Sequence, residues 1–355
     1  MTLALIFAFL ISLGIGILMN NFFIRRPSKF LIKKANDSAE RFSSQTKPIF
    51  GGVGVFVIFL ITLLIVYFFY EGQIKNVQNY IALFIVVVIS FFMGLADDTI
   101  NTPPSFKFVV QVICALIFIF SNIYINISTH QWLNYLITIF WVVGIMNSIN
   151  MLDNMDGIAI LTSLSILSGV IFYSLFTGSF NFLDIFILVT VCATLLSFLF
   201  YNWNPAKMYL GDNGSQIIGA LLAYFGIVFF WNSIHADSYS YGHNIMQLMI
   251  VILAYIVPIC DTATVTINRL LKGKSPFIGG KDHTTHHLFY LGLSVRWVAG
   301  ILFVVNTLGV VLALVLIANK NTINYSYLWL IGIFPAIAFV LLYLNTKFSK
   351  EKKYE

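Results

Sequence analysis

Long apolar runs, each separated from the next by a short polar connection, fill almost the whole chain. A helix that crosses a membrane needs about 20 consecutive, mostly apolar residues. Eleven runs meet this requirement, and they are centred near residues 13, 60, 87, 115, 140, 167, 191, 223, 255, 307 and 335. The longest polar connections, 25–49 and 268–295, leave no room for a soluble domain. The pattern predicts an all-α, polytopic membrane protein with about eleven transmembrane helices in one domain, 1–346, followed by a basic tail, 347–355.

Composition agrees with this fold class. Of the 355 residues, 59% are hydrophobic and 10% are charged, whereas a soluble domain has about 25% charged residues. The first apolar run, 3–24, has no basic segment before it and no small-residue cleavage site, so we interpret it as a retained helix. The net charge of +6 is ordinary for the basic flanks of membrane helices, and we expect no nucleic-acid partner.

The basic residues predict the orientation in the membrane. Every Lys and Arg except Lys75 and Lys320 lies in a connection after an odd-numbered run or in the C-terminal tail. Cytoplasmic loops of membrane proteins carry an excess of Lys and Arg. We therefore expect these connections and the C-terminus in the cytoplasm, and the N-terminus outside.

The acidic residues follow the same asymmetry. The predicted cytoplasmic side holds Asp97, Asp98, Asp153, Asp156, Asp212, Asp261 and Asp282, and the opposite side holds only Glu71, Asp184 and Asp237 near the ends of the runs. Basic anchoring alone would concentrate one sign of charge, whereas this face concentrates both. The pattern predicts a site for a metal ion and a phosphorylated ligand on the cytoplasmic face of the plasma (inner) membrane.

The most unusual stretch is Asn147-Ser-Ile-Asn150-Met-Leu-Asp153-Asn-Met-Asp156-Gly157, between two apolar runs. Asn147, Asn150, Asp153 and Asp156 follow one another at intervals of three residues. Two residues three apart share a helix face, but from the first to the last of the four the side chains turn around the helix axis. A helix that unwinds into a loop here could direct all four at one ligand. Carboxylates at the mouth of a membrane helix are costly, which favours a functional site.

Asp97 and Asp98 end the third apolar run, and Lys107 begins the fourth. Adjacent carboxylates near low-dielectric surroundings repel each other unless a cation compensates them. The pair is therefore a candidate for binding a divalent cation or a lysine, or for proton transfer. The alternative is a solvated helix end, with Lys107 as a membrane anchor or a phosphate ligand.

A second polar segment, 201–215, follows the seventh run. Pro205 stops a helix, and the glycines before and after Asp212 allow tight turns. Asp212 either caps the next helix or supplies an oxygen to magnesium, which binds few carboxylates together with substrate phosphates. Tyr209 could stack on a base or belong to the interfacial aromatic belt.

A third polar segment follows Asp261 and contains Arg269 and three histidines, His283, His286 and His287. These residues could bind phosphate oxygens or a transition metal. A zinc site usually includes Cys or a more dispersed set of ligands, and this loop has no cysteine. A phosphate-binding loop is the better interpretation, with a solvated polar loop as the alternative.

Together these motifs resemble the polyprenyl-phosphate N-acetylhexosamine-1-phosphate transferase family. The resemblance covers most of the chain, from residues 48–52 to the histidine loop, and its motifs occur in the family's order. Residues 150–157 are similar to the family's N-x-x-D-G-x-D-G, with Asn154 in place of the usual glycine. Residues 201–215 are similar to F-N-x-x-P-A-x-x-F-x-G-D-x-G-S, with tyrosine at both phenylalanine positions. The histidine loop resembles H-x-H-H-R-L, with Thr285 at the middle histidine position and His287 at the arginine position.

The resemblance implies a role for each matching residue. It implies magnesium, or alternatively manganese, bound mainly by Asp212 with Asn150 as a second ligand. It implies catalytic roles for Asp97, Asp98, Asp153 and His283. It implies substrate contacts from Lys107, Asp156, Asn202, Tyr209, Arg269 and His286. Among these, Asp156, Asn202 and Tyr209 would hold uridine, and the histidines with Arg269 would hold the diphosphate.

The implied reaction moves an N-acetylhexosamine 1-phosphate, with N-acetylglucosamine 1-phosphate favoured, from a UDP-sugar to undecaprenyl phosphate and releases UMP. It would be the first membrane step of a cell-envelope polysaccharide pathway. A phospho-N-acetylmuramoyl-pentapeptide transferase is one alternative, although its usual P-x-H-H-H loop is missing here. An ion-coupled transporter is an alternative of a different class, but transporters place such acids near the bilayer midplane and often show repeated halves. A homodimer stays open.

Overall fold

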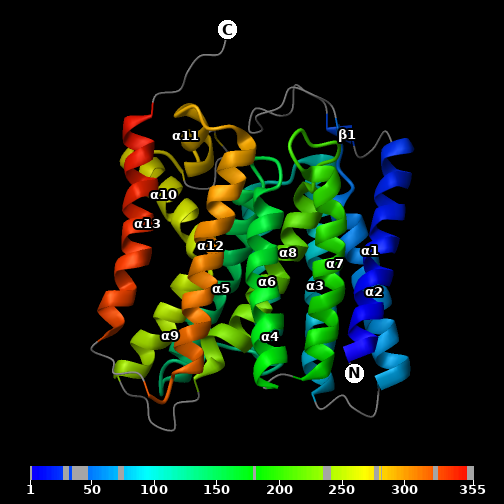
Figure 1. The fold of residues 1–355 in the computed structure, drawn as a ribbon, viewed down its shortest axis with the longest axis horizontal. Helices are drawn as coiled ribbons and strands as arrows, with labels where there is room; N and C mark the ends of the chain where they lie inside the picture. The colour runs from blue at the N-terminus through cyan, green and yellow to red at the C-terminus, as the bar shows by residue number, and fades with distance from the viewer. Residues whose placement is uncertain are drawn as a thin grey trace.

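The apolar runs form a bundle of long helices (Figure 1). The structure is a computed structural model, and it describes residues 2–26, 32–33, 47–70, 76–178, 181–234, 241–275, 280, 282–322 and 327–349. The start of α1 and the end of α13 lie at opposite ends of the bundle (Figure 1). This arrangement is the one expected for an odd number of crossings.

Nine helices in the described part of the chain are long and apolar enough to cross a membrane. They are α1 (Thr2–Arg25), α2 (Gly51–Tyr70), α3 (Val77–Ile100), α5 (Gln131–Leu152), α6 (Ile158–Thr177), α7 (Phe182–Asn202), α8 (Gly211–Phe225) with its π- and 3₁₀-helical continuation to Ser233, α12 (Val295–Ala318) and α13 (Leu328–Phe348). The chain is therefore a helical, multi-pass membrane protein. The exact number of eleven crossings and their sidedness stay predictions.

The two remaining apolar runs differ from the simple pattern. The run near residue 115 forms α4 (Pro104–Phe120), which is shorter than the other spans. The run near residue 255 is broken into α9 (Tyr241–Ala254) and α10 (Ile256–Leu271), which meet at an angle of 87°. A break frees backbone polar groups inside the bundle. The buried Asn306 of α12 compensates by accepting from the Val257 N–H at 3.3 Å and donating to the Ala254 carbonyl at 3.5 Å.

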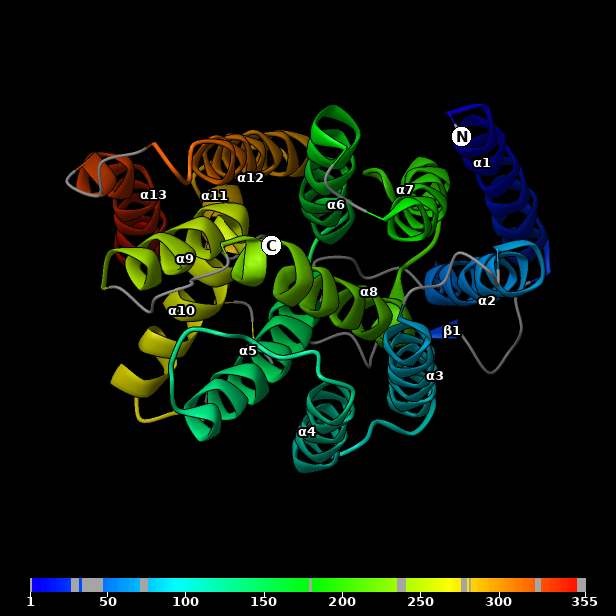
Figure 2. The same ribbon diagram turned by 90° about the horizontal axis from the view of Figure 1, so that it is seen from below.

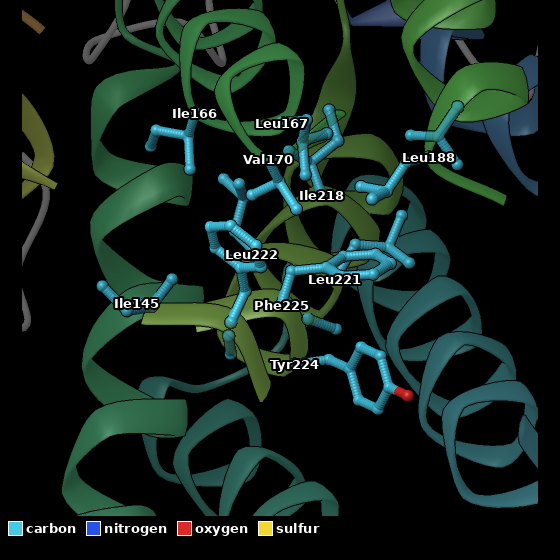
Figure 3. Close-up of a cluster of buried hydrophobic side chains, with 14 of the residues drawn as sticks. Ile145, Ile166, Leu167, Val170, Leu188, Ile218, Leu221, Leu222, Tyr224 and Phe225 are labelled. Atoms are coloured by element: carbon cyan, nitrogen blue, oxygen red, sulfur yellow. The ribbon is translucent and has the colours of Figure 1, made fainter. Parts of the chain in front are cut away.

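Helix α8 lies in the middle of the bundle, with α3, α5, α6 and α7 around it and α1 and α13 far apart at the periphery (Figure 2). Figure 3 shows apolar side chains of α5, α6 and α7 packed against those of α8. The surrounding helices contribute Ile145, Ile166, Leu167, Val170 and Leu188, and α8 contributes Ile218, Leu221 and Leu222. Every residue of α8 except Asp212 is buried. The central helix is therefore packed on all sides, and Asp212 in its first turn is its one residue that is not buried.

Short irregular segments cover one end of the bundle. Two-residue strands β1 (Ile32–Lys33) and β2 (Lys47–Pro48) pair in antiparallel fashion, and Ile49 forms a parallel bridge with Tyr209. The short helix α11 (Thr284–Tyr290) lies at the same end as β1 (Figure 1). This end carries the polar segments that connect the helices.

Candidate active site

The first turn of α8 is held by a carboxylate from another helix. Helix N-termini leave backbone N–H groups without partners inside the helix. Asp98 of α3 accepts hydrogen bonds from the Asp212 N–H at 3.0 Å, the Asn213 N–H at 2.9 Å and the Asn213 Nδ2 at 2.5 Å. Asp98 therefore caps α8, and Asp212 lies in the first turn rather than at the cap.

Two glycines allow this close approach of the helices. A Cβ at Gly94 of α3 would overlap with the Asp212 carbonyl oxygen, and a Cβ at Gly52 of α2 would overlap with the Gly214 backbone. Any side chain at either position would push α8 away from its neighbours. The glycines therefore determine how closely Asp212 lies to the end of α3.

Lys107 of α4 lies between two carboxylates. Its Nζ is 2.5 Å from Asp97 Oδ2 and 3.0 Å from Asp212 Oδ2. Asp97 also accepts hydrogen bonds from the backbone N–H and the hydroxyl of Thr102, at 2.9 and 2.5 Å. Since Asp97 is 7% exposed, it does not lie at a solvated helix end. Three helices thus bring two acids to one cation.

This group of residues fits a magnesium site. Magnesium is usually held by one or two carboxylates together with substrate phosphates rather than by a full set of protein ligands. The Asp97 and Asp212 carboxylates already converge on one positive charge, the Lys107 ammonium. Within the described residues, no group of three or more His, Cys, Asp and Glu side chains is arranged to hold a metal ion. A magnesium ion here would therefore need substrate oxygens.

Helix α5 ends next to this group. Asn150 accepts a hydrogen bond from the Ser215 hydroxyl at 2.8 Å, and the same hydroxyl lies 3.3 Å from the Asp212 carbonyl oxygen. Helix α5 ends at Leu152, and the half-buried Asp153 follows it directly. The expected unwinding of the helix into a loop is confirmed.

The polar residues of this stretch contact different elements. Asn147 bonds with Gln111 of α4. Asp156 accepts hydrogen bonds from Asn204 Nδ2 at 2.9 Å and from the Ala206 N–H at 3.0 Å. Asn147 and Asp156 therefore contact elements other than the first turn of α8, whereas Asn150 contacts Ser215 beside Asp212.

Asn202 and Tyr209 border the same loop. The Asn202 side chain accepts from the Gly157 N–H at 2.9 Å and donates to the Met208 carbonyl at 3.0 Å, so it joins the loop after α5 to the loop after α7. Tyr209 is 7% exposed, and Lys47 Nζ lies 5.2 Å from the centre of its ring. Both residues have structural contacts, and their predicted contacts with uridine stay predictions.

The histidine loop forms a second charged cluster beside α10. The buried Asp261 accepts from the Thr284 N–H at 2.9 Å and the Thr284 hydroxyl at 2.6 Å, and its other oxygen lies 2.8 Å from His283 Nδ1. The rings of His283 and His286 meet edge to face, with centroids 5.5 Å apart. Asp261 therefore fixes one nitrogen of His283 and leaves Nε2 for other contacts.

Arg269 belongs to the same cluster. Its Nε and one terminal nitrogen contact the two oxygens of Asp282 at 2.8 and 2.6 Å. Burial raises the pKa of Asp282, but the hydrogen bonds and charge of Arg269 outweigh burial and hold this pKa below its ordinary value. Lys281, another basic residue of this loop, lies outside the described residues.

The two clusters are linked through the loop after α5. The Thr285 hydroxyl donates to Asn154 Oδ1 at 2.8 Å, which joins the histidine loop to the stretch that contains Asp153 and Asp156. Both positions, Thr285 and Asn154, depart from the family motifs, so a side-chain contact pairs two of the departures. All twelve candidate residues lie in polar segments or helix ends that these contacts connect.

Sequence reasoning missed several residues of the site. Thr102 and Ser215 support the acids, Asp261 orients His283, and Gln111 and Gln216 bond to each other at 3.2 Å below the charged group. Asp261 could have been found from the sequence, because an acid within an apolar run is energetically costly and therefore indicates a function. The two glutamines could also have been found, because each lies four residues after a charged site residue and so on the same face of its helix.

Comparison with known proteins gives one family. Residues 80–230 match the model of glycosyl transferase family 4. This stretch contains every candidate residue except Arg269, His283 and His286. It therefore includes the Asp97–Lys107–Asp212 group but not the histidine loop.

Individual relatives extend the similarity over the rest of the chain. A Bacillus subtilis (strain 168) protein named probable undecaprenyl-phosphate N-acetylglucosaminyl 1-phosphate transferase is 25% identical over 99% of this chain and 96% of its own length. Phospho-N-acetylmuramoyl-pentapeptide-transferases are also similar. That of Streptococcus uberis is 31% identical over 53% of this chain and 61% of its own length. That of Prochlorococcus marinus (strain MIT 9301) is 29% identical over 84% of this chain and 87% of its own length.

Proposed function

Because this chain belongs to glycosyl transferase family 4, we propose that it transfers a sugar 1-phosphate from a UDP-sugar to a polyprenyl phosphate. The favoured donor is UDP-N-acetylglucosamine and the favoured acceptor is undecaprenyl phosphate. The observation that carries the proposal is the convergence of Asp97, Lys107 and Asp212 at one end of membrane-length helices. A lipid headgroup and a water-soluble nucleotide sugar can meet at such a position.

In the proposed reaction, an oxygen of the lipid phosphate attacks the phosphorus that carries the sugar. A new P–O bond forms to the lipid phosphate, and the P–O bond to the UMP phosphate breaks. UMP leaves with the electron pair, and the product is a polyprenyl diphospho-sugar. We infer direct in-line displacement, which requires positioning and charge stabilisation rather than a covalent enzyme intermediate. A phosphorylated aspartate trapped during turnover would contradict this step.

The charged residues have distinct proposed tasks. Two anionic phosphates must approach each other, so positive charge near the reacting phosphorus lowers the barrier. Lys107 supplies one such charge, and its ion pairs with Asp97 and Asp212 keep it at the helix ends. Arg269, His283 and His286 would hold the diphosphate of the donor. Asp98 keeps α8 in register, which orients Asp212.

Magnesium is part of the proposal. Asp212 and Asp97 would hold the magnesium ion together with phosphate oxygens. Asn150, whose side chain contacts Ser215, would be a further ligand. When bound, magnesium would neutralise the charge that develops on the transferred phosphoryl group. Asp153 would support the same group from the end of α5. The site would face the cytoplasm, and the distribution of Lys and Arg supports that orientation.

The direct test uses purified protein in detergent with undecaprenyl phosphate, magnesium and separate UDP-sugars. We expect lipid-dependent release of UMP with UDP-N-acetylglucosamine and none after omission of the lipid or addition of a chelator. UDP-N-acetylgalactosamine and UDP-N-acetylmuramoyl-pentapeptide complete the panel. If no donor gives lipid-dependent UMP, the transferase assignment is wrong.

A second candidate is transfer of phospho-N-acetylmuramoyl-pentapeptide. The observation that favours it is the similarity to the transferases of that name from Streptococcus uberis and Prochlorococcus marinus. The alignment with the Bacillus subtilis relative is longer on both chains, which is why N-acetylglucosamine stands first. UMP release only with the muramoyl-pentapeptide donor would reverse this order.

A further inference from the structure

A layer of amide side chains lies below the charged group, one helical turn deeper in the bundle. Gln111 lies four residues after Lys107 on α4, and Gln216 lies four residues after Asp212 on α8. Asn147 lies three residues before Asn150 on α5. Residues three or four apart lie on the same face of a helix. Each of the three helices therefore carries a site residue with an amide directly beneath it.

The three amides bond to one another across the helices. Gln111 Nε2 lies 3.3 Å from Asn147 Oδ1 and 3.2 Å from Gln216 Oε1. Asn147 Nδ2 donates to Gln111 Oε1 at 2.7 Å and to the Val143 carbonyl at 3.0 Å. Gln111 and Gln216 have no exposed surface. Gln111 is thus the central member, and it joins α4 to both α5 and α8.

Stability alone does not account for this layer. Gln216 Nε2 is buried and has no hydrogen-bond partner among the residues that the structure describes. A buried donor without a partner destabilises a protein, and replacing a whole polar set with apolar groups of similar shape is often neutral or stabilising. The layer therefore has to be explained by what it positions.

The charged group above the layer needs precise axial positions. A shift of one residue along a helix moves a side chain by about 1.5 Å and rotates it by about 100°. Such a shift of α4 would separate Lys107 from Asp212, whose atoms are 3.0 Å apart. Directional hydrogen bonds fix axial position more strictly than apolar contacts, which tolerate sliding.

We propose that Gln111, Asn147 and Gln216 are positioning residues that hold α4, α5 and α8 at the depth where the charged residues meet. Since Gln111 and Gln216 are fully buried, the layer would act on turnover through the charged residues above it, and this effect rests on the proposed function. It gives Asn147, which matches no motif of the family, a defined task. It also predicts that activity and stability respond in different directions when the layer is removed.

The first test replaces the layer with apolar side chains of similar size in the variant Gln111→Met/Asn147→Leu/Gln216→Met. We expect its Tm to equal or exceed that of the wild type, while kcat for UMP release falls at least tenfold and KM for the UDP-sugar changes less than threefold. Gln216→Met alone removes one hydrogen bond and the unpartnered donor. We expect it to keep the wild-type Tm and lower kcat about threefold, which keeps the test valid if the triple variant does not fold.

The matched control is Gln247→Met, which changes a buried glutamine of α9. Gln247 donates to the carbonyls of Asn126, Trp231 and Ile234, and those residues lie in segments far from the charged group. We expect a lower Tm and an unchanged kcat per folded molecule. If the triple variant keeps kcat within twofold of the wild type, the layer has no positioning role.

A second readout does not need turnover. The Tm changes of Lys107→Met, Asp212→Asn and the double variant give the coupling between the two residues. We expect this coupling to fall by at least half when it is measured in the triple-variant background. An unchanged coupling overturns the proposal. Because this measurement is independent of any substrate, absence of UMP release in the wild type would sink the proposed function and leave this test intact.

Discussion

Helix α3 carries a polar cluster near each of its ends, and the two clusters differ in their partners. In its last turn, Asp97 contacts a lysine that also contacts Asp212. In its first turn, the Tyr80 hydroxyl lies 3.1 Å from Asp184 Oδ1 of α7 and 3.3 Å from Asn181 Nδ2. The first cluster combines acids with a cation, whereas the second pairs one acid with neutral groups.

This difference separates a candidate site from a structural contact. The neutral Tyr80 hydroxyl donates to the Asp184 carboxylate and accepts from the Asn181 amide, and these ordinary hydrogen bonds join α3 to the start of α7. Two carboxylates around one ammonium bring together like charges that a simple helix contact does not need. We therefore expect substitutions at the two ends to affect different properties: activity at the charged end, and stability at the neutral end.

The largest effect is expected from Asp212→Asn. The amide keeps the size of the side chain but removes the charge that would hold a cation with the phosphates, so we expect UMP release to fall by at least about 10²-fold. The Tm should change by only a few degrees, because the ion pair with Lys107 is partly exposed. Activity and thermal unfolding are measured on the same purified samples.

Asp184→Asn is the matched control at the other end of the bundle. Asparagine can still accept the hydrogen bond from Tyr80, so activity should stay near the wild-type level. Loss of activity in this variant equal to that of Asp212→Asn would remove the distinction between the two ends.

The next effect is expected from Lys107→Met. Methionine keeps the length of the apolar part of the side chain but leaves Asp97 and Asp212 without their shared cation. We expect turnover to fall about 10-fold to 10²-fold and the free energy of unfolding to fall by about 1–2 kcal/mol, since both acids lose their partner. A Lys107→Arg variant, which keeps the charge, should recover part of the stability. Equal stability of the Met and Arg variants would show that the ion pairs are not formed.

A smaller effect is expected from Asp261→Asn. Asp261 orients His283 through Nδ1, and loss of such an orienting carboxylate typically costs about 10-fold to 10²-fold at metal-bound histidines. Without a metal on His283 we expect the lower figure, measured as kcat for UMP release. Thr284→Val is the control, because it removes one hydrogen bond to the same carboxylate and leaves the contact with His283. If both variants lose the same activity, the role of Asp261 is to hold the loop rather than the ring.

Much of the fold could be predicted from the length of the apolar runs. All eleven runs are helical, because a long apolar segment in a membrane can satisfy its backbone only within a helix. The break at Tyr255 could not be predicted in the same way. It is stabilised by Asn306, whose position beside the break depends on how α12 packs and has no local signature in the run itself.

The charged site could be predicted in part. Clustering of acids on one side and their spacing identified Asp97, Lys107 and Asp212, which the structure brings into direct contact. The task of Asp98 could not be predicted, because adjacent carboxylates look equivalent in sequence. Only the packing of α3 against α8 directs Asp98 to the helix N-terminus and Asp97 to the lysine.

The smallest effect is expected at Asp282, an acid with a charged partner but outside the helices. Arg269 holds the pKa of Asp282 below its ordinary value despite burial, and the unfolded chain titrates near about 3.9. The charged Asp282 carboxylate therefore stabilises the folded protein fully at pH values above its pKa in the unfolded chain. This contribution to the free energy of unfolding is lost as the pH falls through the lower pKa of the folded protein.

Comparison of the wild type with Asp282→Asn across pH tests this pair. Since the carboxylate is 26% exposed, solvent screening limits the difference in unfolding free energy to about 1 kcal/mol or less at pH 7. We expect the wild type to have the higher Tm at pH 7 and the gap to close below about pH 4. A gap that stays constant or widens on acidification would show that Arg269 does not stabilise the charged form of Asp282. In that case Asp261 and the Thr285–Asn154 hydrogen bond would hold the histidine loop, and stabilising ion pairs would be a feature of the Lys107 cluster only.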